Sequence, residues 1–543
     1  MPETFAIHRG SVFNLRFKLN RIPLQRAHHA LAQSCHPQRL LFPTRSDEPN
    51  EPQAVVNREE LELYNRAVEN DDKQLEAVLQ VLQRPRGNVP FIIFGPPGTG
   101  KTTTIVECIL QLLLHEPSSH ILVCTPSNSA ADLLTARLAP HLDSTALFRL
   151  NAFSRAPADI AAAHRAAVLA RSLRNDHDVF AMPSGKDLAK FRVVVCTCCT
   201  AGALTRAGVS RGHFAWVFID EAGQATEPEA MVPIRGMVGA KTDVVLVGDP
   251  KQLRPVIMSM WAKPKLSISY LERLIGMKGV YDFGEGSPDV ISVVQLQQNR
   301  RSQAAIIAFS NSLFYEDSLR ARADLALARS LFHSAVLPNR EFPVMFHGIK
   351  GREEQRKLSK SFFNTVEAQQ ALQYCRTLLE DRERPVSPEN IGIISPYKAQ
   401  VRHIKAMLRS AKIEGVTVGS VEQFQGQERR IIILSTTRSN SNRKQKAFGF
   451  LNDPHRLNVA LTRAQAMLIV IGDPAVLGQD LLWRTFLNYV HKHGGSIGER
   501  YDWDPAKDFI PRGYERIPRE QARAEGEEFL NMVRTEVLVY RGV

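Results

Sequence analysis

Short apolar runs alternate with longer amphipathic stretches along the chain from Pro90 onward. The runs are rich in Val and Ile and helical patterns separate them, which is typical of buried parallel strands connected by helices. The runs form two series, so the pattern predicts an α/β protein with two tandem domains. The first series is 91–94, 120–124, 192–196, 216–219 and 243–247, and the second is 291–296, 344–347, 391–394, 416–418, 430–435 and 467–471.

The stretches outside and between the two series predict the domain boundaries. Residues 154–190 carry an Ala- and Arg-rich helical pattern, which predicts a helical insertion in the first domain. The stretch from Met258 to Pro288 contains no clean strand, so we place the boundary between the domains there. The segment before the first run looks helical over 59–83 and predicts a short N-terminal stalk. The predicted units are residues 1–86, 87–275 and 276–495, followed by a charged C-terminal tail over 496–543.

The charge balance is compatible with a polyanionic partner. The chain has 69 Lys and Arg against 56 Asp and Glu, which gives a formal net charge of +13. Basic side chains that neutralise phosphates release counterions, so the excess fits nucleic-acid binding, while charge that serves solubility explains it equally well. No run approaches the roughly 18 apolar residues of a spanning helix. We therefore expect a protein without a membrane partner.

The cysteines and the N-terminal composition bear on the compartment. Seven cysteines, an odd number, lie mostly in apolar stretches, which predicts reduced thiols inside the cell. Cys196, Cys198 and Cys199 close a Val-rich run and lack a second ligand pair at zinc-site spacing, so we expect buried structural cysteines. Residues 4–46 hold seven basic residues and no acid, as a transit peptide does. We expect this segment instead to belong to the fold of a cytoplasmic protein.

A glycine-rich segment carries the clearest chemical signal. Residues 95–102 match the pattern G-x-x-x-x-G-K-[ST], directly after an apolar run and before a helical stretch over 102–115. In such a P-loop, backbone N–H groups and the helix N-terminus bind phosphate oxygens. Lys101 is expected to reach the β- and γ-phosphates, and the Thr102 hydroxyl to hold Mg²⁺. The candidate ATP-binding residues here are Gly95, Pro96, Pro97, Gly98, Thr99, Gly100, Lys101, Thr102 and Thr103.

A carboxylate pair follows the run 216–219. In open α/β sheets the ends of the strands face the ligand crevice. Asp220 is therefore expected to complete the Mg²⁺ shell, and Glu221 to orient and activate the attacking water. These two motifs predict a P-loop nucleotide hydrolase. A GTPase would need N-K-x-D, which the sequence lacks, while ABC-type and AAA-type machines remain open at this point.

Four further motifs narrow the class. They are Gly248–Pro255, Leu296–Ser302, Gly419–Glu428 and Asn458–Ala464. In kind and order they resemble the motifs of superfamily 1 helicases, in the branch typified by the nonsense-mediated-decay RNA helicase. Within that branch the chain resembles the RNA helicases named after Moloney leukaemia virus resistance and after Armitage, which act in small-RNA silencing. Residues 220–223, 361–364 with Glu367, 394–397 and 449–452 carry this likeness.

The resemblance implies two tandem RecA-like domains that hydrolyse ATP with Mg²⁺. It also implies a role for individual residues. Gln74 would read adenine, and Gln252 would sense the γ-phosphate. Arg301 and Arg463 would be arginine fingers from the second domain, which stabilise the charge of the transition state. Gly426 and Glu428 would lie at the nucleotide, with Glu428 at its ribose. The implied activity is that of an ATP-dependent, 5′-to-3′ RNA helicase in RNA silencing or mRNA turnover.

The resemblance also implies a track for single-stranded RNA across both domains. Small hydroxyls and backbone N–H groups suit contacts to phosphate and sugar. Ordinary turn and capping chemistry is the competing explanation for these residues. The candidate track residues are Pro126, Ser127 and Asn128 in the first domain and Ser395, Pro396, Tyr397, Gly419, Ser420 and Val421 in the second.

The chain departs from the family pattern in two places. Arg300 stands where relatives usually carry a tyrosine that stacks on adenine, and Arg can also stack on a base. Relatives carry an N-terminal β-barrel ahead of the P-loop, whereas about 90 residues precede it here, of which 13–32 resemble the end of that region.

A DNA helicase of the same superfamily is one alternative. A non-hydrolysing RNA-binding scaffold is another, against which the intact motifs argue. We expect a monomer, with silencing or mRNA-decay proteins as candidate partners.

Overall fold

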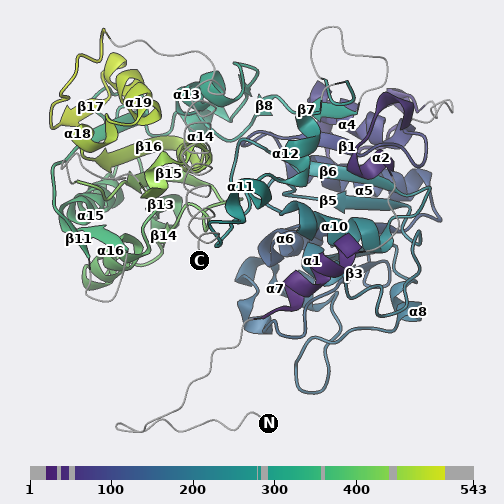
Figure 1. The fold of residues 1–543 in the computed structure, drawn as a ribbon. Coiled ribbons are helices and arrows are strands. Elements are labelled where there is room, and N and C mark those ends of the chain that lie inside the picture. Colours follow the sequence, from purple (N-terminus) through teal and green to yellow (C-terminus); the bar gives the residue numbers. More distant parts are fainter. Residues whose placement is uncertain are drawn as a thin grey trace, which may run out of the picture.

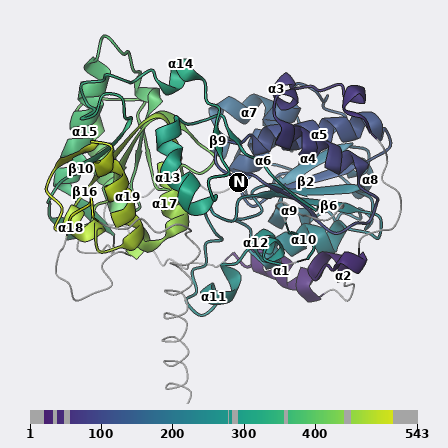
Figure 2. The same ribbon diagram turned by 90° about the horizontal axis from the view of Figure 1, so that it is seen from above.

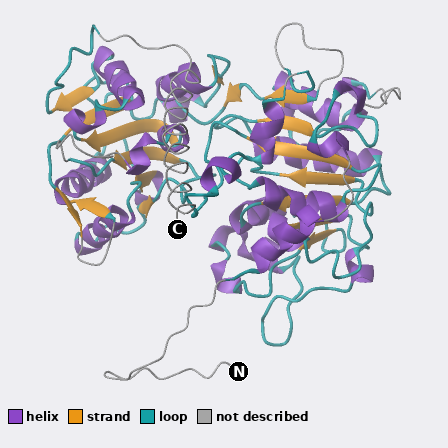
Figure 3. Cartoon of the chain, viewed as in Figure 1, coloured by secondary structure: helices purple, strands orange, loops and turns teal. Residues whose placement is uncertain are grey.

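The computed structural model describes residues 20–32, 38–47, 56–277, 279–282, 292–355, 361–439 and 449–507. Two α/β units lie beside each other (Figure 1), and in each of them helices flank a central sheet (Figure 3). Within the described ranges no helix is long and apolar enough to cross a membrane.

The first unit is built on a seven-stranded parallel sheet with the order β3-β4-β2-β5-β6-β1-β7. Its strands are β1 (Phe91–Phe94), β2 (Ile121–Thr125), β3 (Leu147–Arg149), β4 (Val193–Thr197), β5 (Trp216–Ile219), β6 (Asp243–Gly248) and β7 (Val293–Gln295). Successive residues of a strand point to opposite faces. Thus Phe91 and Ile93 belong to one apolar cluster while Ile92 and Phe94 belong to another, and both faces are buried.

Helices cover both faces of this sheet. The face with Phe91 and Ile93 packs against α4 (Asp72–Gln83), α5 (Lys101–His115) and α6 (Asn128–Leu138). The other face packs against α9 (Cys198–Ala201), α10 (Glu227–Met237) and α12 (Tyr270–Ile275), with α1 (Ile22–Ala32) and α2 (Gln38–Leu41) beside them (Figure 2). Shorter helices are α3 (Arg66–Glu69), α7 (Ala162–Leu169), α8 (Gly185–Leu188) and α11 (Lys263–Leu266).

The second unit has a six-stranded parallel sheet with the order β14-β13-β15-β16-β10-β17. Its strands are β10 (Val344–Gly348), β13 (Ile391–Ile394), β14 (Thr417–Gly419), β15 (Arg429–Ser435), β16 (Ala464–Gly472) and β17 (Ser496–Gly498). One face packs against α15 (Thr365–Glu380) and α16 (Lys398–Ser410). The other packs against α13 (Ala304–Phe314), α17 (Pro454–Leu461) and α19 (Leu481–Lys492). The remaining elements are β8 (Gln298–Asn299), β9 (Arg320–Ala321), β11 (Glu353–Gln355), β12 (Phe362–Asn364), α14 (Leu325–Ala328) and α18 (Pro474–Leu477).

The predicted architecture is confirmed, with four corrections. The run 291–296 was assigned to the second domain, but its strand β7 pairs with β1 and completes the first sheet. The tail predicted from 496 onward begins with β17, which pairs with β10 at the edge of the second sheet. The helical stretch 59–83 is two helices, α3 and α4, because Asp71 caps the start of α4 by accepting from the Gln74 N–H. Strand β3 was missed, and the predicted insertion holds α7 and α8.

The described part of the N-terminal segment lies as expected, and so do two of the three clustered cysteines, while Cys199 is only partly buried. Helix α1 packs on α10, and Arg26 donates to the Cys199 carbonyl at 2.8 Å, so residues 20–32 belong to the first unit. Residues 4–19 lie outside the described residues. Cys196 and Cys198 are buried in the core, where burial raises the pKa of the Cys198 thiol well above its ordinary value.

Candidate ATP site between the two units

The P-loop connects β1 to α5 through a backbone that only glycine adopts easily. Gly98 and Gly100 have φ of +69° and +84°, in the left-handed region. A Cβ on Gly98 would lie 2.6 Å from the Arg301 Cβ, so the loop also needs glycine to let the second unit approach. The Lys101 ammonium donates to the Gly95 carbonyl at 2.6 Å. Thr102 and Thr103 lie partly exposed in the first turn of α5, where their hydroxyls suit a cation and phosphate.

Gln74 lies against the same loop from α4. Its side chain is 2% exposed, and its Nε2 donates to the Thr99 carbonyl at 2.8 Å. Its Oε1 is buried with no hydrogen-bond partner among the described residues. A buried amide oxygen of this kind needs a donor, and the exocyclic amine of adenine supplies one. The site therefore fits an adenine nucleotide at the position that the sequence predicts.

The carboxylate pair lies at the end of β5, beside the P-loop. Asp220 is buried, and burial together with the neighbouring Glu221 raises the pKa of its carboxyl to about 7, against the opposing effect of Lys101. Glu221 is partly exposed and has φ of +53°, a conformation rare for a non-glycine residue and common at functional sites. Gln224 Nε2 donates to a Glu221 carboxylate oxygen at 2.6 Å. Together with the Thr102 hydroxyl, Asp220 offers the oxygen donors that Mg²⁺ prefers.

The γ-phosphate sensor predicted from the sequence connects the two units. Gln252 is buried, and its Nε2 donates to Asp249 Oδ2 at 2.6 Å. Its Oε1 accepts from a terminal nitrogen of Arg463 at 3.3 Å, which joins a loop of the first unit to the end of α17 in the second. Gln252 is thus in contact with one of the two predicted arginine fingers.

The two predicted fingers lie near each other at the same junction. Arg463 is fully buried, and burial together with the charge of Arg301 lowers the pKa of its guanidinium to about 9. Arg301 forms an ion pair with Glu428 and donates to the Thr462 carbonyl at 3.3 Å. The ion pair with Arg301 lowers the pKa of the Glu428 carboxyl although burial opposes it. Glu428, predicted to contact the ribose, is therefore paired with a finger here.

The segment before Arg301 ties the second unit to the P-loop directly. Asn299 Nδ2 donates to the Pro97 carbonyl at 2.6 Å, and the Arg300 N–H donates to the Gly98 carbonyl at 2.9 Å. The Arg300 side chain reaches Asp71 Oδ2 at 3.5 Å, at the start of the helix that carries Gln74. Arg300 thus lies close to Gln74, the residue that is predicted to read adenine. Gly426, on the exposed turn before Glu428, has φ of +70°.

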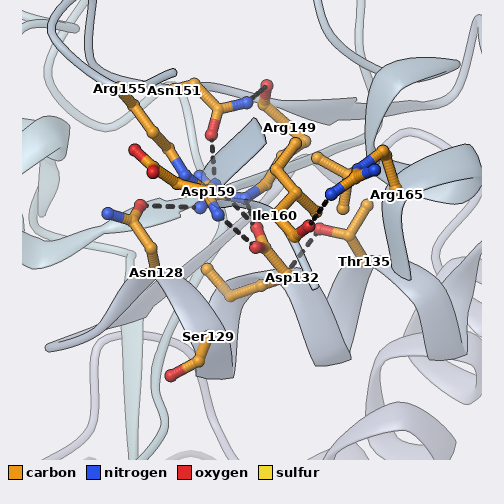
Figure 4. A network of polar contacts seen from close by, with 12 residues as sticks. Asn128, Ser129, Asp132, Thr135, Arg149, Asn151, Arg155, Asp159, Ile160 and Arg165 are labelled. Carbon is orange, nitrogen blue, oxygen red and sulfur yellow. Dashed lines mark hydrogen bonds and ion pairs between the residues drawn. The ribbon is translucent and has the colours of Figure 1, made fainter. Parts of the chain in front are cut away.

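The predicted track residues of the first unit lie at the start of α6. Ser127 is the N-cap of this helix and accepts from the Ala130 N–H. Asn128 is exposed, and its Oδ1 accepts from Arg149 at 3.0 Å. Figure 4 shows Arg149 and Arg155 converging on Asp132, one turn further along α6. No sequence pattern indicates this cluster, because its three members are scattered over 24 positions of the chain and form no motif.

The predicted track residues of the second unit are mostly buried. The Ser395 hydroxyl lies 3.0 Å from the Thr437 hydroxyl, and the Tyr397 ring packs on Phe362 while its hydroxyl accepts from Arg438 at 3.3 Å. Val421 is 3% exposed. The side chains of Ser395, Tyr397 and Val421 therefore do not reach the surface in this conformation. Pro396 is partly exposed, while Gly419 is the last residue of β14 and Ser420 follows it, and both of these are buried.

The site contains two further residues, Tyr315 and Asn458, to which the sequence motifs assign no role. Tyr315 and Asn458 lie with Asp249 in a buried polar network between the units. Asn458 belongs to a recognised motif, so it could have been found there. Tyr315 ends a helix in a stretch without any helicase motif, and no pattern indicates it. Among the described residues no group of three or more His, Cys, Asp or Glu is arranged to hold a metal.

Comparisons with known proteins cover most of the chain. Two family models, each described as an AAA domain, match residues 69–181 with 185–260 and residues 266–475. The chain is 39% identical to the helicase mov-10-B.1 of Danio rerio, over 90% of this chain and 49% of that protein. It is 40% identical to the RNA helicase Mov10l1 of Homo sapiens, over 81% and 36%, and 34% identical to the RNA helicase armi of Drosophila melanogaster, over 90% and 45%. The chain thus spans about half, or less, of the length of these relatives.

Proposed function

Because the chain belongs to the superfamily 1 helicases of the Mov10 and Armitage group, we propose that it uses ATP hydrolysis to move along single-stranded RNA. The direction is 5′ to 3′, and the result is unwinding of RNA or remodelling of RNA–protein complexes. One observation carries the proposal: Gln252 of the first unit, beside the P-loop and the carboxylate pair, accepts a hydrogen bond from Arg463 of the second. A site completed across two units makes hydrolysis depend on their closure.

The roles of the site residues follow from their positions. Glu221 accepts a proton from the attacking water as its oxygen bonds to the γ-phosphorus and the bond to the β–γ bridging oxygen breaks, which yields ADP and phosphate. Lys101, Arg301 and Arg463 stabilise the negative charge that builds on the γ-phosphoryl oxygens. Asp220 and Thr102 would hold Mg²⁺, which neutralises phosphate charge when bound.

The binding of a nucleic acid would act back on this site. A strand held by both units fixes their separation, and this separation sets the distance between the fingers and the P-loop. Backbone-directed contacts at Ser127 and Asn128 would carry no sequence information, which suits a motor that moves along any RNA. The names of the relatives support RNA as the track. We further propose that the protein acts in RNA silencing or mRNA turnover, in the cytoplasm and as a monomer.

Steady-state ATP hydrolysis tests the proposal. The rate is measured for the purified chain alone, with single-stranded RNA, and with single-stranded DNA of equal length, and the Glu221→Gln variant is the matched control. We expect strong stimulation by RNA over DNA and no turnover by the variant. Equal stimulation would favour a DNA helicase of the same superfamily. An absence of hydrolysis in the presence of ATP binding would indicate a scaffold.

A further inference from the structure

Tyr315 reaches from the second unit into the first. It follows α13 as its C-cap residue, is 3% exposed, and its ring lies 6.3 Å from that of Phe94 on β1. Its hydroxyl donates to Asp249 Oδ2 of the first unit at 2.8 Å and accepts from Asn458 Nδ2 on α17 at 2.7 Å. Burial and the neighbouring Asp249 raise the pKa of Tyr315 well above its ordinary value, so the hydroxyl stays protonated and able to donate at neutral pH.

Both partners of this hydroxyl lead to the γ-phosphate sensor and the finger. Asp249 accepts from Gln252 Nε2 at 2.6 Å through the same oxygen that Tyr315 contacts. The Asn458 carbonyl accepts from the Thr462 hydroxyl at 2.7 Å, and a terminal nitrogen of Arg463 donates to that hydroxyl at 3.2 Å.

These contacts form a closed ring. From Tyr315 the ring passes through Asp249 and Gln252 in the first unit and returns through Arg463, Thr462 and Asn458 in the second. It crosses between the units twice, once at the tyrosine hydroxyl and once between Gln252 and Arg463. Asn458 Nδ2 adds a third crossing to the Lys251 carbonyl at 2.9 Å. Buried hydrogen bonds in a connected network strengthen one another and favour one arrangement of their members.

We propose that Tyr315 is a positioning residue, whose hydroxyl holds the two units in the arrangement that aligns Arg463 and Gln252 for hydrolysis. This inference rests on the proposed ATPase function. Among the described residues the Tyr315 hydroxyl is hydrogen-bonded to Asp249 and Asn458 and not to Gln252 or Arg463, so it acts on the sensor and the finger through these two partners. Packing alone needs no hydroxyl, because a phenylalanine would fill the same space against Phe94. The hydroxyl therefore serves the closed arrangement of the site.

The variant Tyr315→Phe tests the proposal, with Tyr489→Phe as its matched control. Tyr489 is partly buried, and its hydroxyl donates to the Ala305 carbonyl within the second unit. Loss of a hydrogen bond to a charged partner should lower the RNA-stimulated kcat about tenfold to a hundredfold. The KM for ATP and the affinity for RNA should stay within about twofold, since no group that contacts either ligand is altered. Tyr489→Phe should keep the wild-type kcat.

A second measurement keeps the proposal distinct from the proposed function. Small-angle scattering reports the separation of the two units whether or not the chain hydrolyses ATP. We expect a larger radius of gyration for Tyr315→Phe than for the wild type and Tyr489→Phe. An unchanged radius, or an unchanged kcat in an active enzyme, would overturn the role of the hydroxyl. If the wild type does not hydrolyse ATP but Tyr315→Phe still has a larger radius of gyration than the wild type, only the proposed function is refuted.

A double-mutant cycle with Asn458→Ala separates a ring from independent contacts. If Tyr315 and Asn458 act through one network, the double variant should lose hardly more kcat than the worse single variant. Losses that multiply would show that the two residues act independently and would reject the ring.

Discussion

The orientation of the Asn128 amide leads to a sharp prediction about RNA binding. Arg149 is fully buried and donates through Nε to Asp132 Oδ1, at 3.1 Å, and through another nitrogen to Asn128 Oδ1, at 3.0 Å. A guanidinium offers donors only, so the amide oxygen of Asn128 must face it. The amide nitrogen then points away from the cluster at the exposed start of α6 (Figure 4). We expect this donor and the Ser127 hydroxyl to contact a phosphate of the proposed track.

The substitution Asn128→Asp replaces that outward donor with a carboxylate oxygen of the same shape. The contact to Arg149 persists and gains charge, so the fold should not suffer. A lost hydrogen bond to a charged phosphate costs about 1.5–3 kcal/mol. Repulsion between two unit charges about 4 Å apart adds roughly 1 kcal/mol in a water-like environment and up to about 4 kcal/mol near a protein surface. The lower sum, about 2.5 kcal/mol, corresponds to RNA binding that is roughly seventyfold weaker or more.

Fluorescence anisotropy with a short labelled RNA measures this loss, and two variants serve as controls. Asn128→Ala removes the donor together with the oxygen that contacts Arg149, but it adds no charge. It should weaken binding by about tenfold to a hundredfold, and by less than Asn128→Asp does. Ser129→Asp adds the same charge at the neighbouring exposed position, which no contact to Arg149 orients toward the track. It should therefore weaken binding less than Asn128→Asp.

Salt dependence separates the two contributions. Raising the salt from about 0.05 M to about 0.3 M shortens the Debye length, so the difference between Asn128→Asp and Asn128→Ala should shrink. The reasoning would be refuted if the two variants bound RNA equally well at low salt, because the amide nitrogen would then not face a phosphate. Equal losses from Ser129→Asp and Asn128→Asp would mean that any charge on this helix end has the same effect.

Three further predictions concern the ATP site and the stability of the first unit. Lys101→Ala should lower kcat about a hundredfold or more. The melting temperature should stay unchanged, since among the described residues the ammonium is hydrogen-bonded only to the loop carbonyl of Gly95. A wild-type rate would exclude the assigned phosphate role. Burial raises the pKa of Asp220 to about 7. Because only the carboxylate form binds a cation, the Mg²⁺ affinity measured through ATP hydrolysis should rise from about pH 6 to about pH 8. If Asp220→Asn shows the same rise, the pH dependence belongs to another group. Asp132→Asn leaves two buried guanidinium groups without their charged partner. It should lower the free energy of unfolding, measured in urea, by about 3–5 kcal/mol, and Arg155→Met should lower it by less. Equal losses would contradict the shared role of this carboxylate.

Local sequence determined the elements and the phosphate site. Runs such as 91–94 and 243–247 became the strands β1 and β6 because a strand buried on both faces must be apolar throughout. The P-loop was predictable residue by residue, since its geometry depends on glycines and a helix start that are contiguous in the chain. Asp220 and Glu221 followed from the strand before them. Their positions required no knowledge of which strands are neighbours.

Only the tertiary structure decided which segments meet. The run at 293–295 has the same apolar pattern whichever sheet it joins, and its pairing with β1 is a contact between distant residues that periodicity does not encode. Exposure is equally non-local: Ser395 and Tyr397 match a motif, yet packing buries both. The ring between the units joins Tyr315 to Asp249 across 66 positions and Arg463 to Gln252 across 211. Such contacts exist because two separately folded sheets dock, and the free energy of docking depends on complementary surfaces rather than on neighbours in sequence.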